Sequence, residues 1–270
     1  MLGYRQRSLQ PLSRRLRDAL RFGRPPRSQR VYLVSVEGRP YKRVVLPDAH
    51  LASTIAGHLR DFGSEGIYPA LILERERELW VEYIEGAALR DATPDAAEGV
   101  AQVLSTLHRH APRAVALAQT PLLEDLRVDL HFLADVGVLT RGGAEALVAR
   151  AEQLAPEVVW IGHDCTDAIA KNFVRTPSGR VRAVDVESLG GDQLIGIGPA
   201  KACLRWLGPE RERFLAGLRA GGSPDFERYL PFAELVFLAF WTKSSLLEGK
   251  RRFVVPRSFE RFLHDGHASL

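Results

Sequence analysis

The sequence predicts an α+β fold, with a small, mainly antiparallel β part followed by a larger helical part. Residues 31–46 have the pattern of a hairpin, in which two β-rich runs flank an E-G-R-P turn. Two more β-rich runs, A-L-I-L-E-R-E and E-L-W-V-E-Y-I, lie between residues 70 and 84. From Asp91 onward, most apolar residues recur at helical spacing. The β-rich runs and the helical pattern therefore occupy separate parts of the chain.

The composition is that of an ordinary soluble protein. The chain has 270 residues, of which 46% are apolar and 26% are charged, and this length suffices for one large domain or for two lobes. It contains no run of 18 or more apolar residues, so we expect no transmembrane segment. The N-terminus has no apolar core of the kind found in signal peptides, and the two cysteines form no disulfide or metal pattern. We therefore expect a cytoplasmic protein.

Residues 1–30 form a strongly basic N-terminal segment, with nine arginines and a single acid, Asp18. Four leucines recur there at helical spacing with arginines between them; they are Leu9, Leu12, Leu16 and Leu20. The pattern predicts a basic amphipathic helix, followed by a linker over 23–29. Such a helix fits three roles: peripheral contact with the anionic inner face of a membrane, binding of nucleic acid, or packing of its leucines against the β part.

The hairpin is followed by a predicted helix. The return strand of the hairpin contains one lysine, Lys42, which shares a face with Val44 because side chains alternate along a strand. Lys42 is therefore either directed into a cleft or exposed on an edge strand. Asp48 stands where a helix N-cap is expected, and the helix after it has an apolar stripe made of Leu51, Ile55, Leu59 and Phe62. No glutamate occurs between residues 48 and 62.

The helical part begins at Pro94. The first helix ends in the residues L-H-R-H, and we interpret His108 and His110 as histidines at a helix C-terminus, which favours positive charge. Two further helical patterns lie within residues 122–156 and lead into a short apolar strand over 158–161. The last part of the chain is again helical in pattern, with an apolar core helix between Ala233 and Trp241.

Three polar side chains are grouped in the segment from Trp160 to Leu189. Asn172 follows Asp167 by five positions, and Asp185 follows Asn172 by thirteen. Between Asn172 and Asp185 lie two short β-like runs joined by a T-P-S-G turn. This hairpin is expected to bring Asn172 and Asp185 side by side at one end of a strand pair, with Asp167 on the loop beside them.

This set of side chains suits phosphoryl transfer from ATP. In that reaction one carboxylate orients the attacking hydroxyl and accepts its proton, while a carboxamide oxygen and a second carboxylate hold Mg²⁺ on the phosphates. Mg²⁺ is a hard ion that takes oxygen ligands, so Asp and Asn are suitable where Cys or His would not be. The alternative is that all three are ordinary polar loop residues, because Asp and Asn are common in loops.

The spacing D-x4-N, followed by an Asp at a strand end, resembles the catalytic and metal loops of the protein-kinase-like fold. The form N-F-V…V-D-V-E is closer to the aminoglycoside and choline phosphotransferases than to the protein kinases, which have D-F-G. By this resemblance Asp167 is the catalytic base, and Asn172 and Asp185 are the Mg²⁺ ligands. The family usually has His two residues before the base, where this chain has Cys165, and Asp164 is the alternative base. We prefer Asp167 because it keeps both separations without a gap.

The resemblance also implies two lobes and a nucleotide site. The implied segments are the basic helix and linker over 1–30, the β lobe and hinge over 31–86, and the helical lobe with the catalytic and metal loops over 87–270. Lys42 is expected to contact the ATP phosphates. The run V-E-Y-I-E-G resembles the family hinge, in which the carbonyl of Glu82 and the N–H of Ile84 would pair with adenine. A glycine-rich phosphate loop and the helix glutamate that orients the lysine are both missing.

The sequence thus predicts a kinase that moves the γ-phosphate of ATP to a hydroxyl of a small molecule, a sugar or a lipid-linked glycan. Only about a dozen residues separate Asp185 from a helix near Pro199, which favours a small acceptor over a protein. Basic residues at Lys243 and 250–252 either select an anionic acceptor or form a solvated face. The alternatives are a nucleotide-binding pseudokinase scaffold and a bacterial protein kinase. Nucleic acid is not an expected partner, because no basic groove interleaved with aromatic residues is present.

Overall fold

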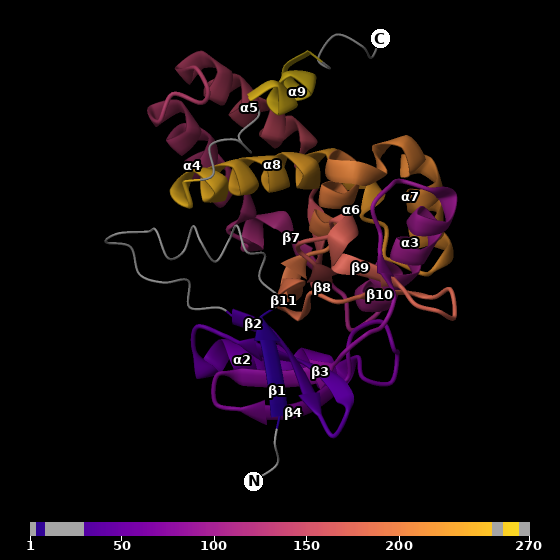
Figure 1. Cartoon of the computed structure of the whole chain (residues 1–270). Helices are drawn as coiled ribbons and strands as arrows, with labels where there is room; N and C mark the ends of the chain where they lie inside the picture. The colour runs from indigo at the N-terminus through magenta and orange to yellow at the C-terminus, as the bar shows by residue number, and fades with distance from the viewer. Residues whose placement is uncertain (1–3, 9–29, 250–255, 265–270) are drawn as a thin grey trace. The chain divides into compact units, whose positions relative to one another are not determined.

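The computed structural model describes residues 4–8, 30–249 and 256–264 (Figure 1). The basic helix and linker were predicted over residues 1–30, of which 1–3 and 9–29 lie outside the described residues, as do the basic residues at 250–252. The described part of that segment, residues 4–8 and Arg30, lies in strands.

The chain divides into two compact units. The first, called the sheet unit, consists of Met1–Asp91 and Ala170–Gly190, and the second, called the helical unit, consists of Ala92–Ile169 and Gly191–Leu270. The hairpin within 170–190, which was expected in the helical lobe, thus groups with the sheet unit. Backbone hydrogen bonds tie it there: the N–H of Leu89 donates to Phe173 O (2.9 Å), and the N–H of Ala183 donates to Ile67 O (2.8 Å).

Within the described residues, the sheet unit contains an antiparallel five-stranded sheet with the strand order β1-β2-β3-β5-β4. The strands are β1 (Tyr4–Ser8), β2 (Arg30–Val36), β3 (Arg39–Val45), β4 (Leu71–Arg75) and β5 (Glu78–Glu82). The predicted hairpin is confirmed as β2 and β3, and the two further β-rich runs are confirmed as β4 and β5. No strand was predicted before residue 31, so β1 is an addition. Lys42 lies on the central strand of this sheet.

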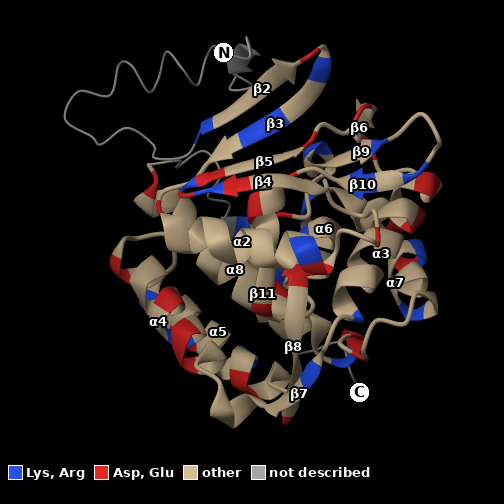
Figure 2. Cartoon of the chain, turned by 90° about the horizontal axis from the view of Figure 1, so that it is seen from below, with Lys and Arg blue, Asp and Glu red and all other residues tan. Residues whose placement is uncertain are grey.

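The core of the sheet unit lies on one face of this sheet. Lys42 and Val44 share one face, where they pair with Val81 and Leu79 of β5. The three apolar residues of this group are fully buried. Helix α2 (Ala49–Asp61) covers this side of the sheet (Figure 2). The sheet unit therefore has its core between β3, β5 and α2.

Helix α2 begins as predicted. The Asp48 side chain accepts a hydrogen bond from Leu51 N (2.8 Å), which is the geometry of an N-cap. The predicted apolar stripe is wrong at one position, because Leu51 is 38% exposed. The residues of α2 that are buried are Ala52, Ile55, Ala56 and Leu59.

A second, smaller sheet of the sheet unit has the strand order β10-β9-β6 among the described residues. Its strands are β6 (Ala87–Ala88), β9 (Phe173–Arg175) and β10 (Val181–Ala183). The predicted turn between β9 and β10 is confirmed, since the N–H of Gly179 donates to Thr176 O (2.9 Å). Gly86, just before β6, has a φ of +152°, and a Cβ there would lie 2.2 Å from Arg175 O. Only glycine lets the chain run this close to β9.

The helical unit is built around the long helix α8. Its main helices are α3 (Pro94–His108), α4 (Leu122–Asp135), α5 (Arg141–Leu154), α6 (Ile197–Ala202), α7 (Arg211–Ala220), α8 (Leu230–Leu247) and α9 (Glu260–His264). The strands β7 (Arg113–Ala116), β8 (Val158–Cys165) and β11 (Leu189–Leu194) form a sheet with the order β11-β8-β7. The predicted helices of this part are confirmed, and β8 is longer than the predicted strand.

Helix α8 contains the predicted apolar core helix. Residues Glu227–Leu247 are long and apolar enough to cross a membrane, with a mean hydropathy of 1.3, but core helices of soluble proteins have the same properties. In this chain 56% of that window is buried. Its buried Glu234 forms ion pairs with Arg211 and Arg261. The burial and this charged cluster favour a core helix.

The end of β8 is fixed by the carboxylate of Asp164, which is fully buried. Its Oδ1 accepts a hydrogen bond from Cys165 N (2.7 Å). Its Oδ2 accepts from Gly196 N (3.1 Å) and Gly198 N (2.9 Å), at the start of α6. Charge-assisted hydrogen bonds of this kind are among the stronger ones. Asp164 therefore holds β8 and α6 together.

His108 joins the same network. It is the last residue of α3, as predicted, but it is also fully buried, which its position at a helix end did not indicate. Its Nε2 lies 3.2 Å from Asp164 Oδ1, and its Nδ1 lies 3.0 Å from Ser223 Oγ. The two ring nitrogens therefore connect the end of α3 to β8 and to the segment after α7.

Gly198→Ala is expected to lower the free energy of unfolding by about 2 kcal/mol or more. A Cβ at this position would lie 2.4 Å from Asp164 Oδ1 and 2.7 Å from Cys165 O, so the network would have to move. Urea unfolding measures the change. Gly142→Ala in α5 is the matched control, because a Cβ at Gly142 would meet nothing within 4 Å, and alanine there should be neutral or slightly stabilising. Equal stabilities for both variants would contradict this role of Gly198.

Candidate active site

The two predicted metal ligands lie side by side in the sheet unit. Asn172 precedes β9 and Asp185 follows β10, and Asn172 Nδ2 donates a hydrogen bond to Asp185 Oδ2 (3.2 Å). The backbone closes the hairpin at the same end, since Val184 N donates to Asn172 O (2.9 Å). Asn172 is buried. The hairpin therefore brings a carboxamide and a carboxylate together, as its sequence pattern indicates.

Lys42 is directed toward this end of the hairpin. Its Nζ donates a hydrogen bond to Val184 O (2.6 Å). Burial lowers the pKa of Lys42, and the carboxylates of Asp185 and Glu187 act in the opposite direction. The alternative of an exposed lysine on an edge strand is therefore wrong. The ammonium of Lys42 and the carboxylate of Asp185 therefore interact electrostatically within the sheet unit.

Glu82, the last residue of β5 and the first of the predicted hinge, forms an ion pair that was not predicted from the sequence. Arg182 donates to both carboxylate oxygens of Glu82, at 2.8 and 2.7 Å, and to Tyr68 O at 2.7 Å. The hydrogen bonds from Arg182 are the main cause that lowers the pKa of Glu82. The backbone N–H of Glu82 donates to Ala70 O (2.9 Å). The side chain of Glu82 thus anchors the hinge to β10 and to the loop before β4.

A pocket of about 400 Å³ lies beside this anchor, within the sheet unit. It is lined by the hinge residues 82–85 and by the β9–β10 turn at 176–178, together with Gly66, Arg180 and Arg182. Ile84, the second predicted adenine contact, is buried.

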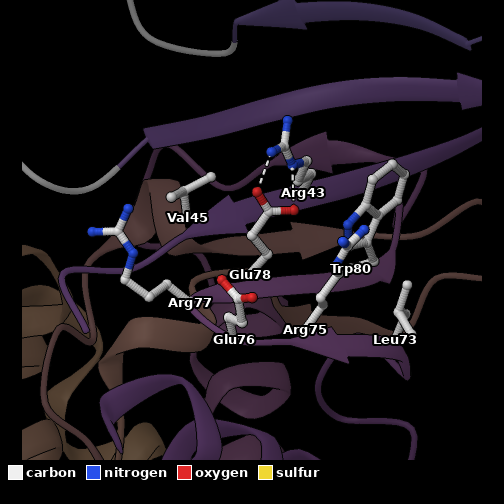
Figure 3. A pocket seen from close by; sticks show the side chains of 8 residues that line it. All are labelled: Arg43, Val45, Leu73, Arg75, Glu76, Arg77, Glu78 and Trp80. Atoms are coloured by element: carbon white, nitrogen blue, oxygen red, sulfur yellow. Dashed lines mark hydrogen bonds and ion pairs between the residues drawn. The ribbon is translucent and has the colours of Figure 1, made fainter. Parts of the chain in front are cut away.

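Another pocket of the sheet unit, of about 450 Å³, lies on the sheet face opposite Lys42 (Figure 3). Arg43 is held there by both carboxylate oxygens of Glu78, with 3.0 Å between Nε and Oε2. Its guanidinium also lies over the rings of Tyr32 and Trp80, with 5.5 and 5.9 Å to the ring centroids. The guanidinium of Arg43 is thus paired with groups of the sheet itself. The lining of this pocket does not include the residues predicted to contact the nucleotide.

The predicted base lies in the helical unit. Asp167 follows β8, and its side chain is 34% exposed. Its Oδ1 forms an ion pair with the ammonium of Lys201 from α6. Lys201 was not predicted, because a single lysine in the run I-G-P-A-K-A matches no catalytic motif.

The two alternative bases have different surroundings. Asp164 is fully buried, and both of its carboxylate oxygens accept backbone hydrogen bonds. Asp167 is the accessible one of the two. A carboxylate that must reach a substrate hydroxyl needs this accessibility. The geometry of the helical unit therefore favours Asp167 over Asp164.

The predicted residues fall into two sets. Lys42, Asn172 and Asp185 lie in the sheet unit, and Asp167 lies in the helical unit. The chain passes from one unit to the other between Ile169 and Ala170. Each set is held by contacts within its own unit.

Lys243, which was considered as a selector of anionic acceptors, has a partner within the helical unit. Its Nζ forms an ion pair with Asp129, and it lies 5.8 Å from the ring centroid of Phe132. Lys243 therefore joins α8 to α4. The ion pair with Asp129 explains the positive charge of Lys243, and no anionic acceptor is needed to explain it.

No protein-family model matches the chain, and no curated protein matches its sequence. Solved structures of small-molecule phosphotransferases are nevertheless similar to it over most of its length. Choline kinase LicA from Streptococcus pneumoniae is 16% identical, with a TM-score of 0.66, and the match covers 86% of this chain and 89% of that one. The macrolide 2'-phosphotransferase MphH from Brachybacterium faecium is 12% identical, with a TM-score of 0.65, and the match covers 100% of this chain and 94% of that one.

A thermostable mutant of the aminoglycoside phosphotransferase APH(4)-Ia, in a ternary complex with ADP and hygromycin B, is similar as well. It is 16% identical, with a TM-score of 0.63, and the match covers 91% of this chain and 93% of that one. At these identities the likeness concerns the fold. The chain therefore has the protein-kinase-like fold found in small-molecule phosphotransferases of the choline kinase and antibiotic kinase type.

Proposed function

We propose that the chain is a phosphotransferase that moves the γ-phosphate of ATP to a hydroxyl of a small molecule, a sugar or a lipid-linked glycan. The observation that carries the proposal is the pairing of Asn172 with Asp185 at the hairpin end to which Lys42 is directed. The fold supports it, because the similar structures include choline kinase and antibiotic phosphotransferases. One of those proteins was solved with ADP.

The donor set of the sheet unit fits Mg²⁺ and ATP. Asn172 and Asp185 offer oxygen atoms from a carboxamide and a carboxylate, and no sulfur or imidazole group is part of the pair. Lys42 offers a positive charge for phosphate oxygens. When bound, Mg²⁺ would neutralise negative charge on the phosphates. In this proposal, the carbonyl of Glu82 and the N–H of Ile84 would bind the adenine edge.

Asp167 is assigned the role of base. Its carboxylate would orient the acceptor hydroxyl and take its proton as the oxygen attacks phosphorus. The support for this role is its accessibility, compared with the buried Asp164, and its position five residues before Asn172. A small acceptor is proposed because the segment between Asp185 and α6 is short. Much of that segment is used by β11.

A second candidate function is that of a nucleotide-binding pseudokinase. The observation in its favour is that Asp61 is the only acid in α2, at its last position, so this helix has no glutamate to orient Lys42. Calorimetry with Mg-ATP, combined with a transfer assay, separates the two functions. Binding with phosphate transfer supports the enzyme, and binding without transfer to any acceptor or to water supports the pseudokinase.

Asp167→Asn is expected to lower kcat for phosphate transfer on the order of 10²-fold or more, because the amide cannot accept the proton of the hydroxyl. Radiolabelled ATP with Mg²⁺ and a panel of hydroxylated acceptors measures the rate. The panel holds choline, ethanolamine, hygromycin B and a macrolide, with water as a further acceptor. Asp192→Asn, which changes an exposed carboxylate in the same unit, is the control and should keep its activity. Full activity of Asp167→Asn would reject the assignment of the base.

Asp185→Asn is expected to weaken Mg²⁺-dependent ATP binding by about 10-fold or more, because a neutral amide is a poorer ligand for a hard cation. Calorimetry with ATP in the presence of Mg²⁺ and of a chelator measures this effect. Glu76→Gln removes an exposed carboxylate from a turn of the same unit and should leave binding unchanged. If Asp185→Asn bound Mg-ATP as tightly as the wild type, Asp185 would not be a metal ligand.

A further inference from the structure

We propose that Lys201 is a positioning residue, whose ammonium holds the carboxylate of Asp167 in the orientation that proton acceptance requires. This inference rests on the proposed function, because it deepens the role of the proposed base. All groups that carry it lie in the helical unit.

The ammonium of Lys201 is surrounded by specific partners. The residue is only 8% exposed. Its Nζ forms the ion pair with Asp167 Oδ1 and lies 3.4 Å from Thr166 O, to which it donates. It also lies 5.4 Å from the centroid of the Phe237 ring. Burial in this way removes most of the water that would otherwise compete for the ammonium, so its position is set by these three partners.

The loop that carries Asp167 is held at three consecutive residues. Lys201 binds the carbonyl of Thr166 and the side chain of Asp167. Trp206 Nε1 donates to Ala168 O (3.0 Å). Inside the loop, the N–H of Ile169 donates to Asp167 O (2.8 Å). The backbone on both sides of Asp167 is therefore fixed, and Lys201 adds the constraint on the carboxylate itself.

Lys201 is itself held in place by the start of its helix. Gly196 precedes α6 with a φ of +116°, and its N–H and that of Gly198 donate to the buried carboxylate of Asp164. On its other side, α6 packs against α8, which supplies Phe237. The position of Lys201 relative to β8 is thus set by hydrogen bonds to a residue three positions before Asp167 in the chain.

Stability alone gives little reason for a buried lysine at this position. A buried ion pair is usually no more stabilising than apolar residues of similar volume, because both charges lose their hydration. A methionine would fill much of the same space beside Phe237. Proper alignment of a reacting group, in contrast, has a large effect on rate. We therefore assign the ion pair to catalysis.

In the reaction, the acceptor O–H bond breaks and its proton passes to Asp167, while the acceptor oxygen bonds to the γ-phosphorus. The bond between that phosphorus and the β–γ bridging oxygen breaks, and ADP leaves with its electron pair. Lys201 takes no part in these bond changes. It limits rotation of the Asp167 carboxyl group, so that the accepting oxygen has one orientation when the hydroxyl arrives.

The kinetic test compares Lys201→Met, Lys201→Arg and Lys243→Met. Lys201→Met should lower kcat on the order of 10-fold or more while the KM for ATP changes little, because the proposed role concerns alignment and not nucleotide binding. Lys201→Arg should restore part of the loss, since it keeps the charge. Lys243→Met is the matched control, because it breaks a lysine–aspartate pair that also has an aromatic neighbour in the same unit. It should keep the wild-type kcat.

The rates are measured with radiolabelled ATP, Mg²⁺ and the same acceptors, including water. A wild-type kcat for Lys201→Met, together with an inactive Asp167→Asn, would overturn the role of Lys201 and leave the proposed function intact. Full activity of Asp167→Asn would reject the base itself. Loss of kcat in Lys243→Met equal to that in Lys201→Met would show a general effect of broken ion pairs, and would also overturn the inference.

Thermal unfolding gives a readout that needs no activity. Asp167→Asn leaves the buried ammonium without its carboxylate, so it should lower the unfolding midpoint more than Lys201→Met does. Adding Lys201→Met to Asp167→Asn should restore part of the loss, because the uncompensated charge is removed. Additive effects of the two substitutions would mean that the pair is not formed, and the inference would fail even if the chain transferred no phosphate.

Discussion

The register of the β9–β10 hairpin is the constraint on which the proposed metal site depends. Phe173 pairs with Ala183, so the residue before β9 and the residues after β10 meet at one end of the hairpin. The hydrogen bond from Val184 N to Asn172 O continues this pairing. Because side chains alternate along a strand, a shift of one residue would turn Asp185 away from Asn172. The turn and the pairing of β9 with β6 oppose such a shift.

The sheet unit arranges charge around this hairpin end. Lys42 comes from the central strand of the larger sheet, and the carboxylates of Asp185 and Glu187 come from the chain after β10. Helix α2 has no glutamate that could play the same electrostatic role. Negative charge near the lysine is therefore supplied by Asp185, directly after the β9–β10 hairpin, and by Glu187. The absence of a glutamate from α2 is therefore a weaker argument against catalysis.

The sequence predicted the parts of the fold whose cause is local. The β2–β3 hairpin has a clear turn between alternating runs, and α2 begins at an aspartate that caps it. The proximity of Asn172 and Asp185 was predictable, because the two residues flank a hairpin pattern. In contrast, α2 buries Ala52 and Ala56 where Leu51 was expected, because the angle at which a helix meets a sheet depends on packing.

The residues that were missed have partners far away in the sequence. His108 contacts Asp164, 56 positions later, and Arg182 contacts Glu82, 100 positions earlier. Lys201 follows Asp167 by 34 positions and lies in a helix without a motif. The sequence around each of these residues has neither an unusual composition nor a periodicity that would indicate its distant partner. The short strands β6 and β7 were missed for a related reason, since two to four residues cannot display an alternating pattern.

The contact between Asp164 and Gly198 has an evolutionary consequence. The carboxylate occupies the space in which any larger residue at 198 would place its first side-chain carbon. The two positions are therefore complementary in volume, and neither can change alone without loss of the bonds between them. Among descendants of this chain, a side chain at 198 should arise together with a smaller or uncharged residue at 164. Linked substitutions at these two sites would therefore mark the lineages that have lost this contact.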